Sequence, residues 1–392
     1  MPTGCVALLL TLGIGPVLGE AAGTDPMELV AEPDLDELEA EADEGLPLVS
    51  SLAEVLAAAP AVEIPARPTL VRHRIRPRER LTHIAIRYGV RREDLLRWNP
   101  SLADDEEFPS GRRTLKVKAR RLPPPRVKVR YVVQADEDWM DVAVKFHVPH
   151  RDLHAYNWNL RTLQPGQEIT LWIDPGWPQT LHPGEGPPVP ERFDVPMGAL
   201  SVGRPNRGRL QDGVLLPLSD LYTRKEPTSG LWGSSHAILQ IHRAFAIFRH
   251  DTGYEGEVVI GALSRRRGGR FSPHVSHQSG RDIDIRLPLW PGADPDGSPS
   301  IDEIDWYAAW GLVRAFIDMG EVDTIFLDVS RHRFLYEAAR GMGETPESLE
   351  AVIKWPRWSG DSRPVVRHSK GHDTHIHVRI KCGPDEPRCR KR

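Results

Sequence analysis

Two short segments near the C-terminal end of the chain alternate between side chains that bind metals or protons and aliphatic side chains. Residues 282–285 read Asp-Ile-Asp-Ile, and residues 375–380 read His-Ile-His-Val-Arg-Ile. Since successive side chains of a β-strand point to opposite faces, each segment predicts a strand with one aliphatic face and one polar face. If the two strands are neighbours in one sheet, the carboxylates and imidazoles meet at a common point. The chain is therefore expected to fold around a sheet that carries its chemistry on one face.

A catalytic zinc ion needs such a meeting point, because it takes three protein ligands from His nitrogen and carboxylate oxygen and keeps a fourth position for water. We predict His277, Asp284 and His377 as the ligands. His277 comes before Gly280, so it can turn in from the loop that precedes the first strand. Two neutral imidazoles and one carboxylate leave the site positive, which acidifies water and polarises a substrate carbonyl. His375 shares the face of His377 and is predicted to exchange a proton with the water or to stabilise the oxyanion.

Other interpretations of these residues are open at this point. Any one of the histidines alone is more often a surface or hydrogen-bonded residue, but five histidines and three aspartates lie within two short segments. A His/His/carboxylate set also holds iron in oxygenases. That class usually has His-x-Asp or His-x-Glu, and the spacing from His277 to Asp284 is wider. A metal site, with zinc as the ion, is the prediction.

The pattern of His277 and Asp284, followed much later by His-x-His, resembles the lysostaphin, D-alanyl-D-alanine peptidase and hedgehog-type group of zinc peptidases. The fuller segments, residues 274–284 and 371–379, resemble the penicillin-insensitive murein endopeptidases, from about Ser201 to Cys389. The resemblance implies an α+β fold with a hedgehog/D-Ala-D-Ala peptidase-like antiparallel sheet and helices. It also implies cleavage of D-alanyl-meso-diaminopimelyl cross-links in peptidoglycan.

The same resemblance implies roles for particular residues. Those that match the zinc ligands of the family are His277, Asp284 and His377, and the one that matches its catalytic histidine is His375. Further residues are expected to line the site: His274, His372 and Asp282.

The first residues of the chain predict export. Residues 1–23 contain an apolar run, Cys5 to Leu18, which is too short to span a bilayer and fits a signal peptide. The segment before that run has no Lys or Arg, so a buried N-terminal element is the alternative. Cys5 has no apolar leader before it, which argues against a lipoprotein anchor. Export predicts a periplasmic location.

The two other cysteines, Cys382 and Cys389, flank a turn-rich loop just after the second polar strand. In an oxidising compartment they would close a ring worth about 2–3 kcal/mol. A thiolate metal site is the alternative, but no second cysteine pair completes it. A disulfide is predicted.

An internal repeat lies between His73 and Ile173. Each copy is expected to form a strand, two helices and a strand, and apolar residues recur at helical spacing in both. The repeat resembles LysM, a small βααβ module that binds N-acetylglucosamine in glycans, and Asn99 and Asn157 match the characteristic asparagine of that family. The second copy keeps the pattern better, whereas the first is basic and divergent. No glycan-binding residue is assigned, and a purely structural role is the alternative.

The remaining segments divide the chain of 392 residues, whose net charge of −4 says little about partners. The basic, proline-rich linker has no aromatic interleaving, so nucleic acid is not an expected partner. The expected boundaries are a signal peptide (1–23), an acidic and alanine-rich disordered spacer (24–69), LysM-like module 1 (70–118), a Pro/Arg linker (119–130), LysM module 2 (131–174), a Pro/Gly linker (175–192) and a zinc metallopeptidase domain (193–392).

These observations predict an exported zinc endopeptidase of the bacterial cell wall, held on peptidoglycan by its modules, with no transmembrane anchor. A D,D- or L,D-carboxypeptidase acting on stem peptides is the alternative within the same class. A non-catalytic peptidoglycan-binding scaffold is the alternative from a different class. The oligomeric state is not predicted.

Overall fold

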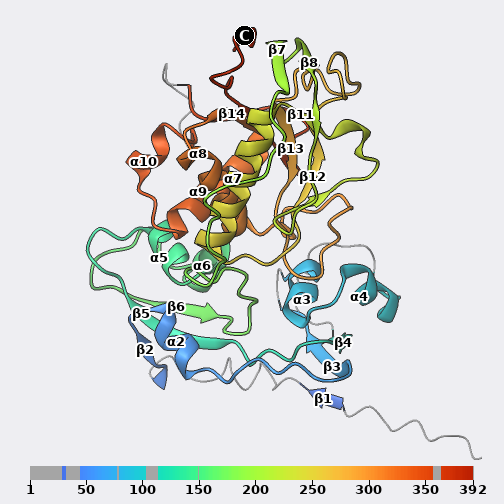
Figure 1. Cartoon of the computed structure of the whole chain (residues 1–392). Helices are drawn as coiled ribbons and strands as arrows, with labels where there is room; N and C mark the ends of the chain where they lie inside the picture. The colour runs from blue at the N-terminus through green and yellow to red at the C-terminus, as the bar shows by residue number, and fades with distance from the viewer. Residues whose placement is uncertain are drawn as a thin grey trace, which may run out of the picture.

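The computed structural model describes residues 29–31, 45–76, 79–102, 114–148, 150–355 and 363–391 (Figure 1). The predicted signal peptide, residues 1–23, lies outside the described residues. Within the described ranges, no helix combines the length and the apolar character that crossing a bilayer requires. Helices and sheets occur throughout, so the α+β class is confirmed.

The N-terminal part of the chain forms two small units of the same element order. The first consists of β3 (Thr69–Arg74), α3 (Leu81–Tyr88), α4 (Arg92–Trp98) and β4 (Thr114–Ala119). The second consists of β5 (Val127–Val132), α5 (Trp139–Lys145), α6 (His150–Tyr156) and β6 (Glu168–Ile173). In each unit the two strands pair antiparallel and enclose a separate apolar core.

One asparagine plays the same structural part in both units. Asn99 donates from Nδ2 to the carbonyls of Leu95 (2.8 Å) and Lys116 (2.9 Å), and its Oδ1 accepts from the Lys116 amide at 2.8 Å. Asn157 makes the equivalent three bonds with Leu153 and Thr170, each at 2.9 Å. Both side chains are buried. The repeat seen in the sequence is thus matched by repeated hydrogen bonding that joins the second helix to the last strand.

Elements of the structure lie across two of the expected boundaries of this region. The spacer is not disordered over residues 48–58, where β2 (Leu48–Val49) pairs parallel with β5 and α2 (Leu52–Ala58) follows. Val55 of α2 is buried in the apolar core of the second unit, which is how this short helix is stabilised. β1 (Leu29–Ala31) likewise pairs parallel with β3. The Pro/Arg linker ends earlier than expected, because β5 begins at Val127.

The C-terminal part is built on a six-stranded sheet of order β10-β12-β13-β16-β14-β15. The strands are β10 (Thr223–Arg224), β12 (Val259–Ala262), β13 (Asp282–Arg286), β14 (Val322–Leu327), β15 (Val366–His368) and β16 (His375–Ile380). The four central strands pair antiparallel. Both edge pairs, β10 with β12 and β14 with β15, are parallel, a feature that the expected antiparallel sheet did not include. Two further strand pairs flank the sheet: β7 (Leu200–Arg204) with β8 (Arg207–Gln211), and β9 (Val214–Leu215) with β11 (Trp232–Gly233).

Helices cover one side of this sheet (Figure 1). They are α7 (Ser235–Thr252), α8 (Trp306–Asp318) and α9 (Val329–Gly341), with the short α10 (Pro346–Glu350) after them. The aliphatic residues of β13 and β16, among them Ile283, Ile285 and Val378, are fully buried in one core with the apolar stripes of α7 and α8. The alternation of the two strands therefore places their polar residues on the opposite face.

Both long helices begin at a side-chain cap. Ser234 accepts the Ala237 amide at the start of α7, and Asp305 accepts the Ala308 amide at 3.0 Å at the start of α8. The C-terminal cap of α7 is Gly253. Its φ of 61° is left-handed, a conformation that glycine adopts without strain. These caps fix where the helices lie on the sheet.

Asp305 predicts a pH dependence of stability. Burial raises its pKa to about 6, although the Ala308 amide and the Thr180 hydroxyl oppose the shift. The folded chain then binds this proton more tightly than the unfolded chain. The free energy of unfolding should therefore fall by up to about 3 kcal/mol as pH rises from about 4 through 6. Asp305→Asn keeps the cap without the charge. The variant should therefore gain thermal stability over the unmodified chain at pH 7.5 and lose that gain at pH 4. A stability difference that does not change with pH would contradict this account.

The predicted disulfide between Cys382 and Cys389 is present. Glu386 lies inside its loop, is 5% exposed, and accepts from the Ser201 amide at 3.0 Å and the Gly383 amide at 2.8 Å. Arg281, fully buried, donates to the carbonyls of Ile380 and Arg390. The loop after β16 is thus held against Ser201 of β7 and against Arg281, the residue that precedes β13.

Candidate metal centre

The register between β13 and β16 places the polar residues of the two strands opposite one another. Asp284 pairs with His377, Asp282 with Arg379 and Arg286 with His375. Their side chains share the face that the helices leave free. The prediction that the two alternating segments are neighbouring strands is confirmed.

His277 reaches this face from the loop before β13. Its backbone has a left-handed φ of 65°, which is uncommon for a residue with a side chain. The conformation is held by a hydrogen bond from the His277 amide to Asp282 Oδ2 (3.1 Å). Strained backbone of this kind concentrates at sites where a side chain must point in one direction.

Three atoms of the predicted ligands converge. His277 Nε2 lies 3.1 Å from Asp284 Oδ1 and 3.2 Å from His377 Nδ1. His377 Nδ1 lies 3.3 Å from the same Asp284 oxygen. The three residues are 1%, 7% and 5% exposed in the order His277, Asp284, His377. The strands and the loop therefore bring one atom from each side chain to a single buried point.

The second ring nitrogen of each buried histidine faces a protein acceptor. His277 Nδ1 lies 2.9 Å from the Leu263 carbonyl, and His377 Nε2 lies 3.4 Å from Asp282 Oδ2. Asp282 is itself held by Arg379, whose Nε and Nη2 donate to it at 2.7 and 3.0 Å. Outer partners of this kind orient histidines that bind metals and fix which nitrogen faces the ion.

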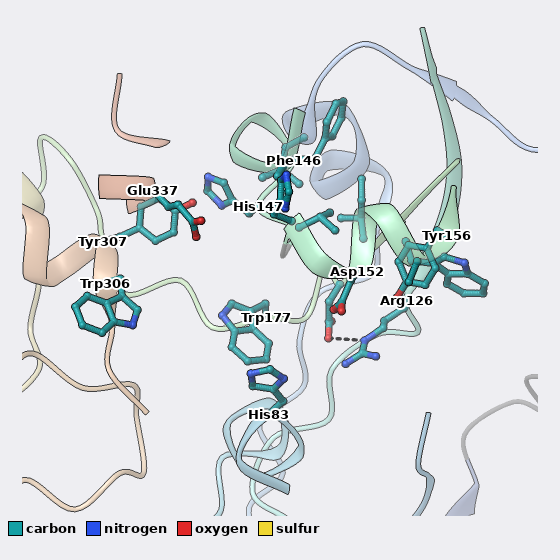
Figure 2. Close-up of a pocket in the computed structure, with 18 of the residues that line it drawn as sticks. His83, Arg126, Phe146, His147, Asp152, Tyr156, Trp177, Trp306, Tyr307 and Glu337 are labelled. Carbon is teal, nitrogen blue, oxygen red and sulfur yellow. Dashed lines mark hydrogen bonds and ion pairs between the residues drawn. The ribbon is translucent and has the colours of Figure 1, made fainter. Parts of the chain in front are cut away.

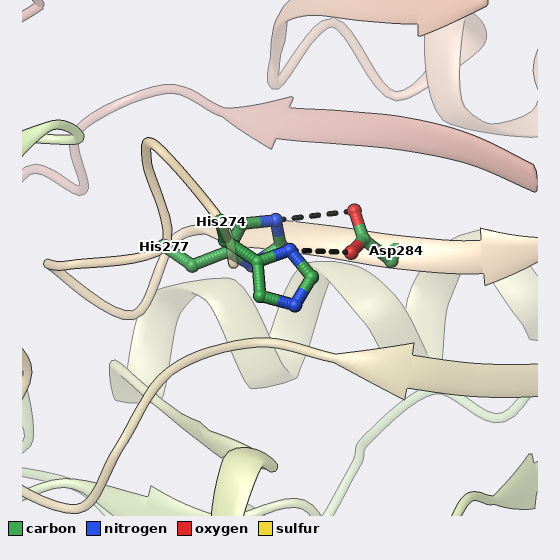
Figure 3. A group of neighbouring side chains, drawn as sticks. All are labelled: His274, His277 and Asp284. Carbon is green, nitrogen blue, oxygen red and sulfur yellow. Dashed lines mark ion pairs between the residues drawn. The ribbon is translucent and has the colours of Figure 1, made fainter. Parts of the chain in front are cut away.

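Three further histidines border this point on its more open side. His274 Nδ1 lies 3.3 Å from Asp284 Oδ2, and Figure 3 shows its ring and that of His277 both directed at the Asp284 carboxylate. The His372 ring lies 5.6 Å from the His377 ring and 4.9 Å from the His375 ring. All three residues are partly exposed. The structure thus brings every residue of the predicted site to one side of the sheet.

The electrostatics of the site are dominated by two buried carboxylates. Burial opposes ionisation of Asp284, but His277 and His377 outweigh it and hold the pKa of that carboxyl well below its usual range. The pKa of Asp282 is lowered in the same way by His377 and Arg379, again against burial. Burial would lower the pKa of His377, yet the two carboxylates raise it to about 9. Burial lowers the pKa of His375 to about 4.

These residues fit a divalent metal ion. Asp284 Oδ1 is buried and makes no hydrogen bond of normal geometry among the described residues. Its near neighbours are His277 Nε2 and His377 Nδ1, the ring nitrogens of the other two predicted ligands. Ring nitrogens and a carboxylate oxygen are the ligands that zinc takes in catalytic sites. Asp284 is shared by two groups with metal-ligating geometry, one with His274 and His277 and one with His372 and His377. The donor set therefore accommodates an ion at Asp284 with histidines on either side.

Two contributors to the site were not assigned from the sequence. Arg379 follows the same alternation as His375 and His377, so its place on the polar face could have been read from the pattern. The Leu263 carbonyl could not have been predicted in this way, because the side-chain pattern contains no information about backbone groups. The Leu263 carbonyl contacts His277 directly. Arg379 acts on His377 through Asp282.

Asp282→Asn tests the orienting role of this carboxylate. The amide keeps the shape of the side chain but weakens its hold on His377 and Arg379, so metal affinity should fall about 10–100-fold. Competition with a chelating dye measures the affinity. Asp318→Asn, at an exposed position of α8 on the helical side, is the matched control and should bind metal as the unmodified chain does. Equal affinity in the two variants would exclude the orienting role.

Comparison with known families agrees with the resemblance expected from the sequence. Residues 201–341 match the family described as penicillin-insensitive murein endopeptidase, and residues 73–117 match the LysM domain. The first match contains His274, His277 and Asp284 and ends before His375. The LysM match falls on the first unit, which the sequence had marked as the more divergent copy.

Curated relatives carry the same description. A penicillin-insensitive murein endopeptidase of Pectobacterium atrosepticum is 28% identical over 234 residues, which cover 56% of this chain and 74% of the relative. The protein of that description in Yersinia enterocolitica is 26% identical over 231 residues, covering 54% of this chain and 73% of the relative. One from Escherichia coli is 24% identical over 214 residues, covering 50% and 71%.

Proposed function

We propose that this chain, whose residues 201–341 match the penicillin-insensitive murein endopeptidase family, is an exported zinc endopeptidase that hydrolyses D-alanyl-meso-diaminopimelyl cross-links in peptidoglycan. The observation that carries the proposal is the convergence of His277, Asp284 and His377, with ligand atoms 3.1–3.3 Å apart, beside the partly exposed His375. At that point a buried carboxylate oxygen makes no hydrogen bond of normal geometry and lies against two ring nitrogens, which favours a cation among the three atoms.

His277, Asp284 and His377 would hold the zinc ion, with His274 and His372 lining its surroundings. When bound, zinc supplies a Lewis acid that polarises a carbonyl and acidifies water. This choice of ligands is favoured because His277 and His377 are the most buried histidines of the group and have their second nitrogens directed at protein acceptors.

His375 is the residue proposed to move protons. It lies on the polar face of β16, two residues before His377, and is less buried than the proposed ligands. In hydrolysis of the cross-link, the C–N bond of the amide breaks, the carbonyl carbon gains the oxygen of water, and the leaving amine gains a proton. His375 would accept the proton of the attacking water and return it to the amine nitrogen.

The two N-terminal units would hold the enzyme on its insoluble substrate. We propose that both are LysM modules of βααβ form, because they share element order and the hydrogen bonding of Asn99 and Asn157. Attachment to the wall raises the local concentration of cross-links at the catalytic site. The catalytic domain would have the hedgehog/D-Ala-D-Ala peptidase-like architecture, and residues 1–23 would direct it to the periplasm.

Digestion of purified sacculi tests the proposal. The full chain, loaded with zinc, is incubated with sacculi, and the muropeptides are then separated and identified by mass. Loss of cross-linked dimers with a matching gain of monomers is the expected result. Loss of terminal D-alanine alone would identify a carboxypeptidase instead. An unchanged muropeptide profile would favour a non-catalytic scaffold.

A further inference from the structure

A cavity of about 630 Å³ lies where the two N-terminal units meet the helices of the C-terminal domain (Figure 2). Its walls come from α2, β5, α5, α6 and β6, from residues at and before α3, from the segments that flank β5 and β6, and from α8, α9 and the loop that bears Trp290. The volume is within the range of about 300–1,000 Å³ that is usual for small-molecule sites. Since no single unit forms it, the cavity depends on their docking.

Direct contacts frame this cavity. Arg340 of α9 donates to Asp141 of α5 at 2.9 Å, which joins the second unit to the helical layer. Arg126, in the linker between the two units, donates to Glu79 and to Asp174, each at 3.0 Å. These charged pairs, partly or fully buried, hold the three parts in register around the space between them.

Aromatic rings line the cavity from every side. Four of the eleven tryptophans of the chain contribute: Trp172, Trp177, Trp290 and Trp306. All four are partly exposed rather than buried in a core. Figure 2 shows Trp177 between a wall with Trp306 and Tyr307 and a wall with Asp152 and Tyr156. Trp306 stacks on Phe334 and Arg76 lies over the Trp172 ring, whereas Trp177 meets His83 and Trp290 in T-shaped contacts. A partly exposed ring of the latter kind, with polar groups beside it, suits a ligand that has apolar C–H faces and hydroxyl edges, as a pyranose ring has.

The charges around the cavity disfavour a polyanion as the ligand. Three cationic side chains, Arg76, Arg126 and Lys128, face four carboxylates, Glu79, Asp152, Asp174 and Glu337. Recognition of a polyphosphate chain requires an excess of Lys and Arg. Arg126 is paired with Glu79 and Asp174, so the lining carries no such excess of positive charge, and an uncharged polar ligand suits it better.

We propose that this cavity binds a short, uncharged segment of the glycan strand of peptidoglycan, with sugar rings stacked on Trp177 and its neighbouring tryptophans. The proposal rests on the proposed action on peptidoglycan, which supplies such a strand. β13, which carries Asp284, runs on into the segment that bears Trp290. Sugar bound here stabilises the docked arrangement of modules and catalytic domain, because the cavity exists only in that arrangement.

Hydrogen exchange of the full chain with a peptide-free probe tests this proposal. The probe is a β-1,4-linked N-acetylglucosamine pentamer, which has no cross-link to cleave, so the result does not depend on peptidase activity. At saturating probe, exchange should slow in peptides that contain Trp177 and Trp306. Ala155→Arg, which fills the cavity from an exposed position of α6, should abolish this protection. Ala135→Arg adds the same charge at an exposed position between β5 and α5, away from the lining, and should keep it.

The Trp177→Ala variant supplies a second measurement. The probe concentration that protects the Trp306 peptide should rise by about tenfold or more in this variant. Trp177→Phe keeps an aromatic face and should restore most of the affinity. Absence of protection in the unmodified chain, or equal protection in Ala155→Arg, would overturn the proposal. So would protection of these peptides by polyglycerol phosphate but not by the sugar.

Discussion

The His377→Ala chain is expected to bind zinc more than about 100-fold more weakly than the unmodified chain and to leave peptidoglycan cross-links intact. His377 contributes the nitrogen that lies 3.2 Å from His277 Nε2 and 3.3 Å from Asp284 Oδ1. Loss of groups that only orient a ligand costs about 10–100-fold in metal affinity, so loss of a ligand itself should cost more. Metal content after gel filtration and a chelator titration measure the effect.

The matched control for this variant is His368→Ala. His368 is an exposed histidine of β15, on the edge of the same sheet, and its Nδ1 only accepts from the Val329 amide. This control should retain one zinc per chain. If His377→Ala also retained zinc at full affinity, the proposed ligand set would be wrong, and the group of Asp284 with His274 and His277 would take its place.

The His375→Ala chain is expected to keep its metal and to lose about 10²–10⁴-fold in the rate of cross-link cleavage. His375 lies on the same face as His377 but outside the three converging atoms, so its removal leaves the ligand set complete. The magnitude is that of a positioned general acid–base group. Release of monomers from sacculi gives the rate, and the zinc content of the same preparation shows that the metal is present.

Two outcomes would contradict the role of His375. Full activity of the alanine variant would show that another group moves the proton. Loss of zinc together with activity would show that His375 acts as a ligand rather than as a proton carrier. Asp282→Asn provides the comparison, since it should weaken metal binding without removing His375.

The site was predictable because its residues follow strand periodicity. Asp284 and His377 alternate with isoleucine and valine on two strands, so the sequence placed them on one face and the sheet register then set them opposite each other. Asn99 and Asn157 were found by a different route, as the positions of the two repeat copies that match the characteristic asparagine of the LysM family. Such patterns are local, and local patterns survive in the fold because side-chain direction follows the backbone.

Features that depend on contacts between distant segments were not predictable. The acidic composition around residues 34–44 suggested disorder for the whole spacer, but residues 48–58 order because Val55 packs into the core of the second unit. The parallel edge pair of β14 and β15 joins segments that lie far apart in the sequence, and the tryptophan-lined cavity arises from docking of separate units. Apolar and aromatic residues in these segments indicate that the segments pack against another part of the chain. The sequence does not indicate which part that is.

Anomalous diffraction at the zinc edge, from crystals of the full chain, tests the central claim most directly. One peak is expected at about 2.0–2.2 Å from His277 Nε2, His377 Nδ1 and a carboxylate oxygen of Asp284 together. A peak at another place in the chain, or one at this place that lies within bonding distance of only one of the three residues, would contradict it.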